Sequence, residues 1–361
     1  MFYFRADGNS KIGMGHLMRS MSIASNMMEM TDVCFLCADN QSTEIALRNG
    51  FDAITLDEIP FSSEEVQKII RIIENNSSEP MPDDSTESKT NALLIDSYDV
   101  NNEYIFAIKP YAKVMIMDDT ADSPFMADAV INYNVYASYE EYEKLYGKCG
   151  NTVPQFVLGG KYVPLRKEFS AENIRDYDRA ENILISTGGS DSLRLAPQIV
   201  KALLNDDELM SRNIHVVCGR FSDSANELNE IAESHPNVIV HRDVKNMSTL
   251  IGMCDIGLSA GGSTCYELSV MGLPFVVFSY AENQVRLSKS MSDNKVALYA
   301  GNITDEESKN QVIAKISDLL KSLSCNFGLR KELGANGKSL VSPDGAKNLS
   351  CRLYELTEEN E

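Results

Sequence analysis

Residues 2–19 read FYFRADGNSKIGMGHLMR, and this stretch decides the fold that we expect. Its first part, Phe2–Ala6, is short, apolar and rich in β-forming residues, which is typical of a parallel strand covered on both faces. A helix is predicted over Gly15–Met28 from apolar residues at helical spacing, which we interpret as core. Gly13 and Gly15 lie between them, where they allow a ligand to approach the backbone and the free N–H groups of the helix.

The same alternation of strand and helix continues along the chain. Two successive alternations predict two doubly wound, Rossmann-like α/β domains with a ligand cleft between them. We place these domains at 1–170 and 171–361, with a polar surface insertion at 75–90. Three helical segments are expected after the last strand. Further strands are expected at Asp32–Cys37, Ala53–Leu56, Ala92–Asp96, Lys113–Met117, Ala129–Asn132, Asn182–Ser186, Ile214–Cys218, Asn237–His241, Asp255–Ser259 and Pro274–Phe278.

Composition narrows the class of protein. The length of 361 residues suits two domains, and the 43% of hydrophobic residues suits a core in each. The formal net charge of −20 argues against binding to nucleic acid or to an anionic membrane. Charged residues interrupt the first apolar run, and no apolar window reaches the length of a membrane span. We therefore expect a cytoplasmic, monomeric enzyme that acts on a small molecule.

The eight cysteines are scattered, mostly in apolar runs, which is typical of reduced and buried thiols. Cys34 and Cys37 have the spacing of a redox motif, but both fall in one predicted strand. Successive strand residues alternate between faces, so these two thiols would point in opposite directions. We expect both to be structural.

His16 is the candidate catalytic residue, and it is one of only four histidines. It falls in the first turn of the predicted helix, where the helix dipole disfavours imidazolium and leaves a neutral ring able to accept a proton. An ordinary surface histidine is the alternative, but the position beside two glycines and Arg19 at a strand–helix switch favours a site. For His215, His235 and His241 we expect structural roles.

Two further glycine-rich turns follow predicted strands in the second half. STGGSD at 186–191 contains Gly188, Gly189 and Ser190, and SAGGSTCYEL at 259–268 contains Ser263, Thr264 and Glu267. Such turns suit a diphosphate without a metal ion, because backbone N–H groups and hydroxyls supply the donors. Glu267 lies one turn into the following helix, where it either accepts the hydroxyls of a ribose or complements the helix N-terminus.

No metal or other cofactor is expected. Asp118 and Asp119 end a predicted strand and then turn, and 176–178 (DYD) falls in a charged, solvated stretch. The histidines and cysteines nowhere have the spacing of a zinc site.

Several motifs follow one another along the chain in this order: FRADGNSKIGMGHLMR at 4–19, LIDSY at 94–98, MDD at 117–119, INYNVY at 131–136, LGGKYVPLRKEF at 158–169, the two glycine-rich turns, and ENQ at 282–284. Together they resemble the UDP-2,4-diacetamido-2,4,6-trideoxy-β-L-altropyranose hydrolases of pseudaminic acid biosynthesis. The second half also resembles the UDP-binding domain of glycosyltransferases that make peptidoglycan lipid precursors. This resemblance implies a GT-B arrangement of the two domains.

The resemblance implies roles for individual residues. His16 matches the base that activates water, and Gly13 and Gly15 before it and Arg19 after it are expected to bind the substrate. Positions near the sugar match Tyr98 and Asn283, with Gln284 beside them. The loops around the diphosphate match Gly188, Gly189, Ser190, Ser263 and Thr264, whereas Val244 matches the segment that reads uracil and Glu267 the carboxylate that holds the ribose.

The implied reaction is an inverting hydrolysis. Water attacks the anomeric carbon opposite the UDP, and the sugar C–O bond breaks. UDP is a stable anion that leaves without much protonation, so one base suffices. Glycosidases that release an alcohol use two carboxylates instead.

Two alternatives stay open. A GT-B glycosyltransferase would pass the sugar to an acceptor and would need an acceptor groove, often with a basic and apolar membrane face. The first half of the chain shows no such pattern, which favours hydrolysis. A non-catalytic protein that binds nucleotide sugars, for instance in spore-coat polysaccharide assembly, would not need His16.

Overall fold

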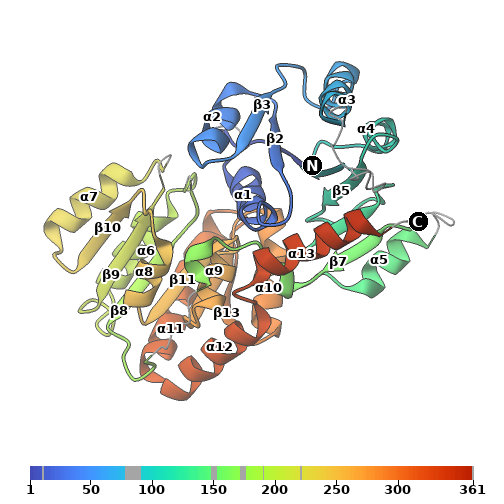
Figure 1. Ribbon diagram of the computed structural model, residues 1–361. Helices are drawn as coiled ribbons and strands as arrows, with labels where there is room; N and C mark the ends of the chain where they lie inside the picture. Colours follow the sequence, from blue (N-terminus) through green and yellow to red (C-terminus); the bar gives the residue numbers. More distant parts are fainter. Residues whose placement is uncertain are drawn as a thin grey trace. The chain divides into compact units, whose positions relative to one another are not determined.

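The computed structural model describes residues 1–9, 12–77, 91–147, 153–170, 176–189, 191–219 and 222–359. Its contacts divide the chain into two compact units: unit 1 is Met1–Arg166 with Asp344–Glu361, and unit 2 is Lys167–Pro343. Each unit is built around one parallel sheet (Figure 1). The segment 344–361, expected in the second domain, packs with the first unit instead.

Unit 1 contains a seven-stranded parallel sheet in the order β3-β2-β1-β4-β5-β6-β7. The order reverses between β1 and β4, because the chain builds outward from β1 to β3 and then returns to the other side of β1. The strands are β1 (Phe2–Ala6), β2 (Val33–Cys37), β3 (Asp52–Thr55), β4 (Ala92–Asp96), β5 (Lys113–Met117), β6 (Ala129–Asn132) and β7 (Gln155–Leu158). The α-helices are α1 (Gly15–Met27), α2 (Asn40–Arg48), α3 (Ser63–Ser77), α4 (Asn102–Ile108), α5 (Tyr139–Tyr146) and α13 (Gly345–Glu358).

The central strands of unit 1 are buried on both faces, as their continuous apolar sequences predict. One face packs against α3, α4 and α5, which contribute Ile69, Ile105 and Tyr142 to the core. Cys34 and Cys37 on β2 are buried and free of disulfides. Burial raises the pKa of the Cys34 thiol to about 11 and that of Cys37 to about 12, so both stay protonated, in agreement with a structural role.

Unit 2 contains a six-stranded parallel sheet in the order β10-β9-β8-β11-β12-β13, which reverses between β8 and β11. The strands are β8 (Asn182–Ser186), β9 (Asn213–Cys218), β10 (Val238–Arg242), β11 (Ile256–Ala260), β12 (Phe275–Ser279) and β13 (Ala297–Asn302). The α-helices are α6 (Leu195–Leu204), α7 (Ala225–Ser234), α8 (Met247–Met253), α9 (Thr264–Val270), α10 (Glu282–Asp293), α11 (Glu306–Cys325) and α12 (Phe327–Leu340). Short 3-10 turns lie at Gly160–Tyr162 in unit 1 and Lys167–Phe169 in unit 2.

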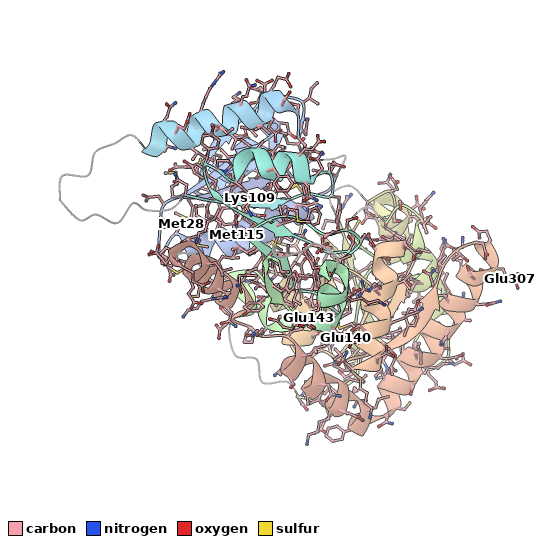
Figure 2. The ribbon with its side chains drawn as sticks, turned by 90° about the vertical axis from the view of Figure 1, so that its right-hand side faces the viewer. Met28, Lys109, Met115, Glu140, Glu143 and Glu307 are labelled. Atoms are coloured by element: carbon pink, nitrogen blue, oxygen red, sulfur yellow. The ribbon has the colours of Figure 1, made fainter. Side chains whose placement is uncertain are left out.

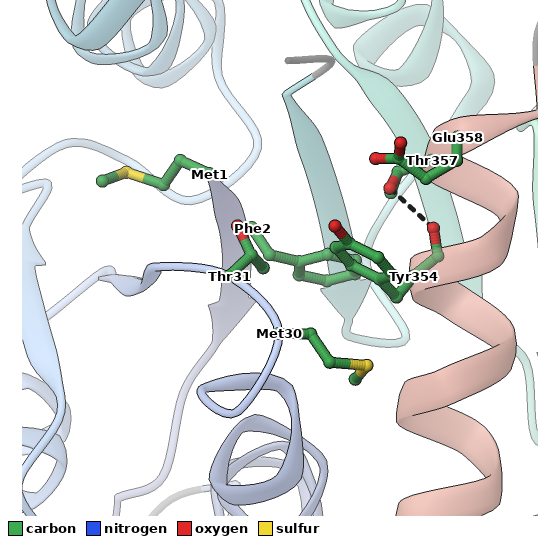
Figure 3. Close-up of a pocket in the computed structure, with 7 residues that line it drawn as sticks. All are labelled: Met1, Phe2, Met30, Thr31, Tyr354, Thr357 and Glu358. Carbon is green, nitrogen blue, oxygen red and sulfur yellow. Dashed lines mark hydrogen bonds between the residues drawn. The ribbon is translucent and has the colours of Figure 1, made fainter.

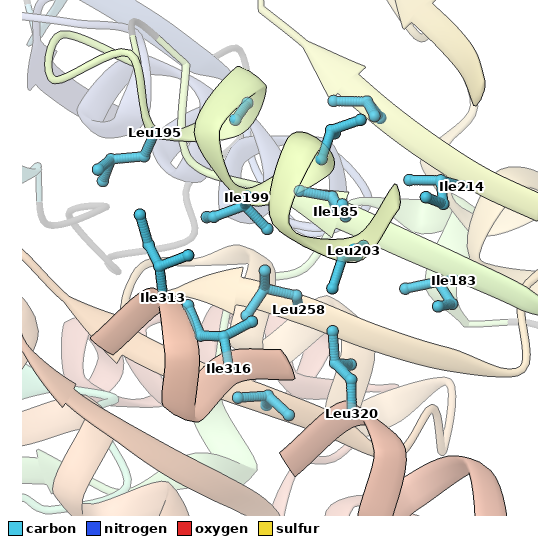
Figure 4. Packing of buried hydrophobic residues seen from close by; sticks show 14 of the residues in the cluster. Ile183, Ile185, Leu195, Ile199, Leu203, Ile214, Leu258, Ile313, Ile316 and Leu320 are labelled. Carbon is cyan, nitrogen blue, oxygen red and sulfur yellow. The ribbon is translucent and has the colours of Figure 1, made fainter. Parts of the chain in front are cut away.

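The core of unit 2 lies between its sheet and two helices. Figure 4 shows Ile199 and Leu203 of α6 and Ile316 and Leu320 of α11 facing isoleucines and leucines of the strands. All four helix residues are fully buried. The apolar periodicity of both helices thus places their buried sides against the sheet, and the loops at the strand ends stay available for a ligand.

Polar side chains cap the amino ends of several helices. Asp39, Ser138 and Asn246 accept hydrogen bonds from backbone N–H groups in the first turns of α2, α5 and α8. Asp305 and Ser308 form a reciprocal capping box at α11. These caps explain why the helices start where they do.

Most expected strands are confirmed within one residue at each end, but β7 and β13 were not predicted. Both lie at a sheet edge, where burial on both faces is not required. β7 has only four residues, and its Gln155 is exposed. β13 carries Gly301 with φ of 132° next to a shift in register. The sequence of β7 therefore lacks the continuous apolar run by which most other strands were recognised, whereas β13 contains such a run at 296–300 and was missed all the same. Of the expected insertion at 75–90, residues 78–90 lie outside the described residues.

The helix α13 completes unit 1. It packs along α1 and contacts the short turn at Gly160–Tyr162. Ser350 of α13 donates a hydrogen bond to the backbone carbonyl of Ile23 at 2.8 Å. Close approach requires a glycine, because a Cβ at Gly345 would lie 2.2 Å from the backbone oxygen of Val163.

The surface reflects the acidic composition. Glu140 and Glu143 on α5 and Glu307 on α11 are exposed (Figure 2). Among the helices of the described part, none is long and apolar enough to cross a membrane.

Candidate functional site

The first group of candidate residues lies where the strand order of unit 1 reverses. Ala6, at the end of β1, pairs directly with Asp96, at the end of β4. The loop after β1 leads into α1, whose first turn carries His16, and the loop after β4 carries Tyr98. In open α/β sheets, ligands bind at this switch point outside the carboxyl ends of the strands.

His16 lies in the first turn of α1, as predicted, and contacts Asp96. Its Nδ1 is 2.6 Å from Oδ1 of Asp96. The His16 side chain keeps 14% of its surface exposed, whereas that of Asp96 keeps 1%. A buried carboxylate thus touches one ring nitrogen of a partly exposed imidazole, and this arrangement orients the ring and stabilises the charge that it gains with a proton.

Arg19 lies one turn after His16 and connects three strand ends. Its Nε is 2.6 Å from Oδ2 of Asp96. Its Nη1 is 2.8 Å from Oδ2 of Asp119, the second residue after β5. Nη1 also donates to the hydroxyl of Tyr133, after β6, at 2.7 Å. Arg19 was predicted to bind substrate, but its guanidinium is already engaged by two carboxylates and a phenol.

Tyr98 covers the exposed side of this group. Its ring lies edge-on to the His16 ring, with centroids 4.9 Å apart and an interplanar angle of 83°. Its hydroxyl donates to Oδ2 of Asp119 at 3.0 Å. Tyr98 is nevertheless 61% exposed, so most of the ring is available to a ligand beside His16. This position agrees with a location near the sugar.

Charge holds the group together. Burial alone would raise the pKa of Asp96, but the Arg19 guanidinium outweighs burial and lowers the pKa of Asp96 to about 2. Asp96 is therefore ionised at neutral pH. Burial, and then the neighbouring Asp119 carboxylate, raise the pKa of Tyr98, so its phenol stays protonated and remains a donor.

Gly13 and Gly15, in the loop before α1, are exposed, and a Cβ at either would meet no atom within 4 Å. Gly13 has φ of 82°, which favours glycine, and its N–H donates to the carbonyl of Asn9 at 2.9 Å. The space beside both glycines is open, as a binding loop requires.

The second group of candidate residues lies at the switch point of unit 2. The loop after β8 contains Gly188 and Gly189, and that after β11 contains Ser263 and leads into Thr264 at the start of α9. Gly188 has φ of 101°. A Cβ at Gly219, after β9, would lie 2.1 Å from the oxygen of Gly189, so the loops after β8 and β9 pack backbone against backbone. Ser190 lies outside the described residues.

Asp191, which sequence reasoning did not select, is buried and has a structural explanation. Its carboxylate accepts from the backbone N–H groups of Leu195 and Ala196 at 3.0 and 3.2 Å, and from the hydroxyl of Ser224. These contacts fix the loop after β8 to the start of α6 and to the segment before α7.

The third glycine-rich turn is held by α10. A Cβ at Gly261 would lie 2.2 Å from Oγ of Ser288, whereas at Gly262 it would meet nothing within 4 Å. Ser263 is exposed, and Thr264 and Glu267 are half-buried on α9. The tight packing at Gly261 thus presents Gly262 and the two hydroxyl residues at the surface of the switch point.

The three remaining predicted residues are Val244, Asn283 and Gln284, and their surroundings differ. Val244 is half-buried and follows Asp243, whose φ of 47° turns the backbone after β10. Asn283 is exposed in the first turn of α10, as a ligand-binding residue would be. Gln284 instead accepts a hydrogen bond from the backbone N–H of Tyr280 at 3.0 Å, so its oxygen is used to hold the loop after β12.

Two cavities lie away from these sites. A cavity of about 30 Å³ at the amino end of β1, lined by Phe2, Met30 and Tyr354, is too small for a nucleotide (Figure 3). A wider surface groove runs along α6 and α7, and its cations Arg194 and Lys201 pair with Glu227 at 2.7 Å. The described residues contain no group of three or more histidines, cysteines and carboxylates that could hold a metal ion.

Sequence reasoning missed Asp96, Asp119 and Tyr133 as site residues. Asp96 ends β4 and Asp119 is the second residue after the adjacent strand β5, so the parallel pairing of these strands brings both to one sheet edge. That position was the available signal. Tyr133 follows β6 in the same way.

Comparison with known proteins shows which family and which relatives this chain is similar to. Residues 182–341 match the family described as Glycosyltransferase family 28 C-terminal domain. The chain is 26% identical over 289 residues to a UDP-2,4-diacetamido-2,4,6-trideoxy-beta-L-altropyranose hydrolase from Campylobacter jejuni, which covers 78% of this chain and 92% of that protein. It is also 26% identical over 360 residues to the spore coat polysaccharide biosynthesis protein SpsG from Bacillus subtilis, which covers 98% of each. The resemblance drawn from the motifs is confirmed.

Solved structures show the same fold. MurG from Acinetobacter baumannii aligns over 99% of both chains with a TM-score of 0.66 at 14% identity. A UDP-glucosyltransferase from Polygonum tinctorium aligns over 99% of this chain and 98% of that one, with a TM-score of 0.69 at 13% identity. With its two parallel α/β sheets, the chain therefore has the GT-B fold that the sequence predicts.

Proposed function

We propose that this protein hydrolyses a UDP-linked sugar to UDP and the free sugar, with His16 as the general base. The observation that carries the proposal is the contact of the partly exposed His16 ring with the buried carboxylate of Asp96 at a switch point. In an imidazole held in this way, Nδ1 contacts the carboxylate and Nε2 is left to contact a second partner, such as a water molecule. Such a ring removes a proton from water as it attacks.

The reaction is a displacement at the anomeric carbon. The water oxygen forms a bond to this carbon as its bond to the UDP oxygen breaks, UDP leaves as an anion, and the proton passes to His16. The sugar configuration inverts. General-base assistance supplies roughly 10²–10⁴-fold of the rate. Backbone N–H groups of unit 2 supply the stabilisation of the departing diphosphate.

Unit 2 is the proposed UDP-binding part. Its glycine-rich turns lie at the reversal between β8 and β11, where nucleotides bind in open sheets. The family 28 match over residues 182–341 supports this assignment. We assign the ribose to Glu267, the diphosphate to the turns with Gly188, Gly189, Ser263 and Thr264, and the uracil to the backbone at Val244.

The substrate that best fits the similarity is UDP-2,4-diacetamido-2,4,6-trideoxy-β-L-altropyranose, which the Campylobacter jejuni protein is named for. Glycosyl transfer is the alternative, because the family 28 name and the solved relatives include glycosyltransferases. The two activities differ in whether UDP is released without an acceptor.

The test is an assay of UDP release from a panel of UDP-sugars without any acceptor. His16→Gln should lower kcat by roughly 10²–10⁴-fold with little change in KM, because the base acts only in the transition state. His235→Gln, in an exposed position after α7, is the matched control. Equal turnover of wild type and His16→Gln would contradict the role of His16 as the general base. UDP release that requires an added acceptor would favour glycosyl transfer.

Reaction in ¹⁸O-labelled water separates the two bonds that could break. Attack at the anomeric carbon places the label on the sugar, whereas attack at phosphorus places it on UDP. Label in UDP would refute the proposed displacement even if His16 proved essential.

A further inference from the structure

The hydrogen bonds of Asp96 determine which nitrogen of His16 carries the proton. Asp96 is ionised at neutral pH and can only accept hydrogen bonds. Its Oδ1 lies 2.6 Å from Nδ1 of His16. An unprotonated Nδ1 at this distance would set two lone pairs against each other, so Nδ1 must be the protonated nitrogen. The lone pair then resides on Nε2.

Arg19 also approaches this ring. Its Nη2 is 3.2 Å from Nδ1 of His16 and donates to Oδ1 of Asp96, the same oxygen that faces His16. Because Nδ1 carries a proton, the 3.2 Å approach is a contact between a cation and a ring, not a hydrogen bond. Arg19 therefore binds Asp96 and places a positive charge beside the imidazole.

We propose that Asp96 and Arg19 are positioning residues, which fix His16 as the Nδ1–H tautomer with Nε2 available as the base. This inference rests on the proposed function and extends it to two residues that act through His16. It also changes the role of Arg19, which was expected to bind the substrate.

The geometry supports a positioning role for Arg19. Its guanidinium reaches Asp96, Asp119 and Tyr133, at the ends of three neighbouring strands. Only 13% of the side chain is exposed. A guanidinium that bound a diphosphate would need its N–H groups directed at solvent, but these N–H groups are directed at protein oxygens. Ser20 adds a further donor to Asp96 at 3.3 Å.

The charges around the ring predict opposite effects for the two residues. Among the described residues, the titratable groups that face His16 are Asp96, Arg19 and Tyr98, with Asp119 behind them. Removing the Asp96 charge disfavours the imidazolium that forms during catalysis. Removing the Arg19 charge favours it, because one cation fewer lies beside the ring.

The first experiment does not depend on activity. Histidine-selective ¹⁵N labelling and long-range ¹H–¹⁵N spectra report the tautomer of each ring in the free protein, and His16→Gln assigns the signal. We expect Nδ1–H for His16 in the wild type. In Asp96→Asn this preference should be lost, since an amide donates as well as accepts. Asp32→Asn, at the exposed amino end of β2, is the control. An Nε2–H signal in the wild type, or an unchanged signal in Asp96→Asn, overturns the proposal.

The second experiment measures kinetics. Asp96→Asn should lower kcat by roughly 10²–10⁴-fold with little change in KM. Arg19→Gln should move the acidic limb of the kcat–pH profile to higher pH and leave UDP affinity unchanged, with the exposed Arg48→Gln as control. Weaker UDP binding with an unmoved profile would return Arg19 to substrate binding. If wild type released no UDP from any sugar, the proposed function would fail, and the tautomer spectra would still decide whether Asp96 orients His16.

Discussion

Two histidines that lie side by side in unit 2 connect the stability of its sheet to pH. Nδ1 of His215 on β9 is 2.9 Å from Nε2 of His241 on β10, and their rings stack with centroids 5.2 Å apart. Burial lowers the pKa of both imidazoles, and each charge would repel the other, although Asp255 opposes this for His215. The expected structural role of both residues agrees with these contacts.

The folded state therefore binds fewer protons than the unfolded state as pH falls. Histidine in an unfolded chain titrates near about 6.5. The pair's contribution to the free energy of unfolding is fully present above that pH and decreases below it, through the lowered pKa values of the folded state. His241→Gln should make the loss of stability between pH 7.5 and 5.5 shallower in urea unfolding. His235→Gln should not, and equal slopes in all three proteins would contradict the prediction.

Glu267 has two readings that a binding measurement can separate. It is half-buried in the first turn of α9, where a carboxylate complements the helix N-terminus or accepts ribose hydroxyls. If it holds the ribose, Glu267→Ala should weaken UDP binding by about 1.5–3 kcal/mol, the usual size of a hydrogen bond to a charged group. Calorimetry in excess chelator measures this and tests metal-independent binding as well. Glu230→Ala on α7 is the control, and an unchanged affinity returns Glu267 to its structural role.

Single residues were predictable where a local pattern determines their position. His16 was placed in the first turn of a helix from the glycines and the apolar spacing alone. Asp96 and Arg19 were not given their roles, because the contact that defines them joins residues 77 positions apart. A strand end indicates where a side chain lies, but not which partner it meets.

At the scale of elements, the loops after β8 and β9 are held together at one point. Gly219→Ala would push a Cβ into the oxygen of Gly189, 2.1 Å away. We expect a loss of about 1–3 kcal/mol in the free energy of unfolding, as for other overpacked sites. Weaker UDP binding should accompany it if the Gly189 loop contacts the diphosphate.

Gly262 provides the matched comparison, because an added Cβ meets no atom within 4 Å. Gly262→Ala should leave urea stability nearly unchanged. A loss of UDP affinity would then come from contact with the ligand alone. If Gly219→Ala were as stable as wild type, the backbone packing of the two loops would not be as close as described.

The burial of a strand also determines how readily it is recognised in the sequence. Central strands such as β1 and β4 are buried on both faces, so their apolar runs were sufficient to find them. The edge strands β3, β7, β10 and β13 each pair with one neighbour and have mixed exposure; β3 and β10 were predicted, whereas β7 and β13 were not. Their pairing partners are not visible in the local sequence.

At the scale of the whole molecule, unit 1 is assembled from two separated parts of the chain. The sequence shows helical periodicity over 344–361 but not the partner of this helix, so the predicted boundary assigned it to the preceding domain. Its contacts with α1 and with the turn at Gly160–Tyr162 place it in unit 1. The buried Ser350, for example, donates a hydrogen bond to the carbonyl of Ile23, 327 positions earlier.

Gly345→Ala should therefore destabilise unit 1 selectively. The added Cβ would lie 2.2 Å from the oxygen of Val163, and overpacking of this kind lowers the free energy of unfolding by about 1–3 kcal/mol. Hydrogen exchange should become faster in α1 and α13 and stay unchanged in β8 to β12. Gly328→Ala on α12, where the nearest atom would be 3.5 Å away, is the control. Equal acceleration in both units would show that they do not unfold separately.

The return of α13 to unit 1 also sets the order in which the chain matures on the ribosome. Unit 2 is one continuous segment, 167–343, and every partner that it needs emerges before residue 344. Unit 1 is synthesised first but stays without α13 until the 177 residues of unit 2 have followed, which at about 5–20 residues per second takes roughly 10–35 seconds. During this interval the side of α1 that α13 later covers is open to chaperones, and the domain that is begun first is the one that is completed last.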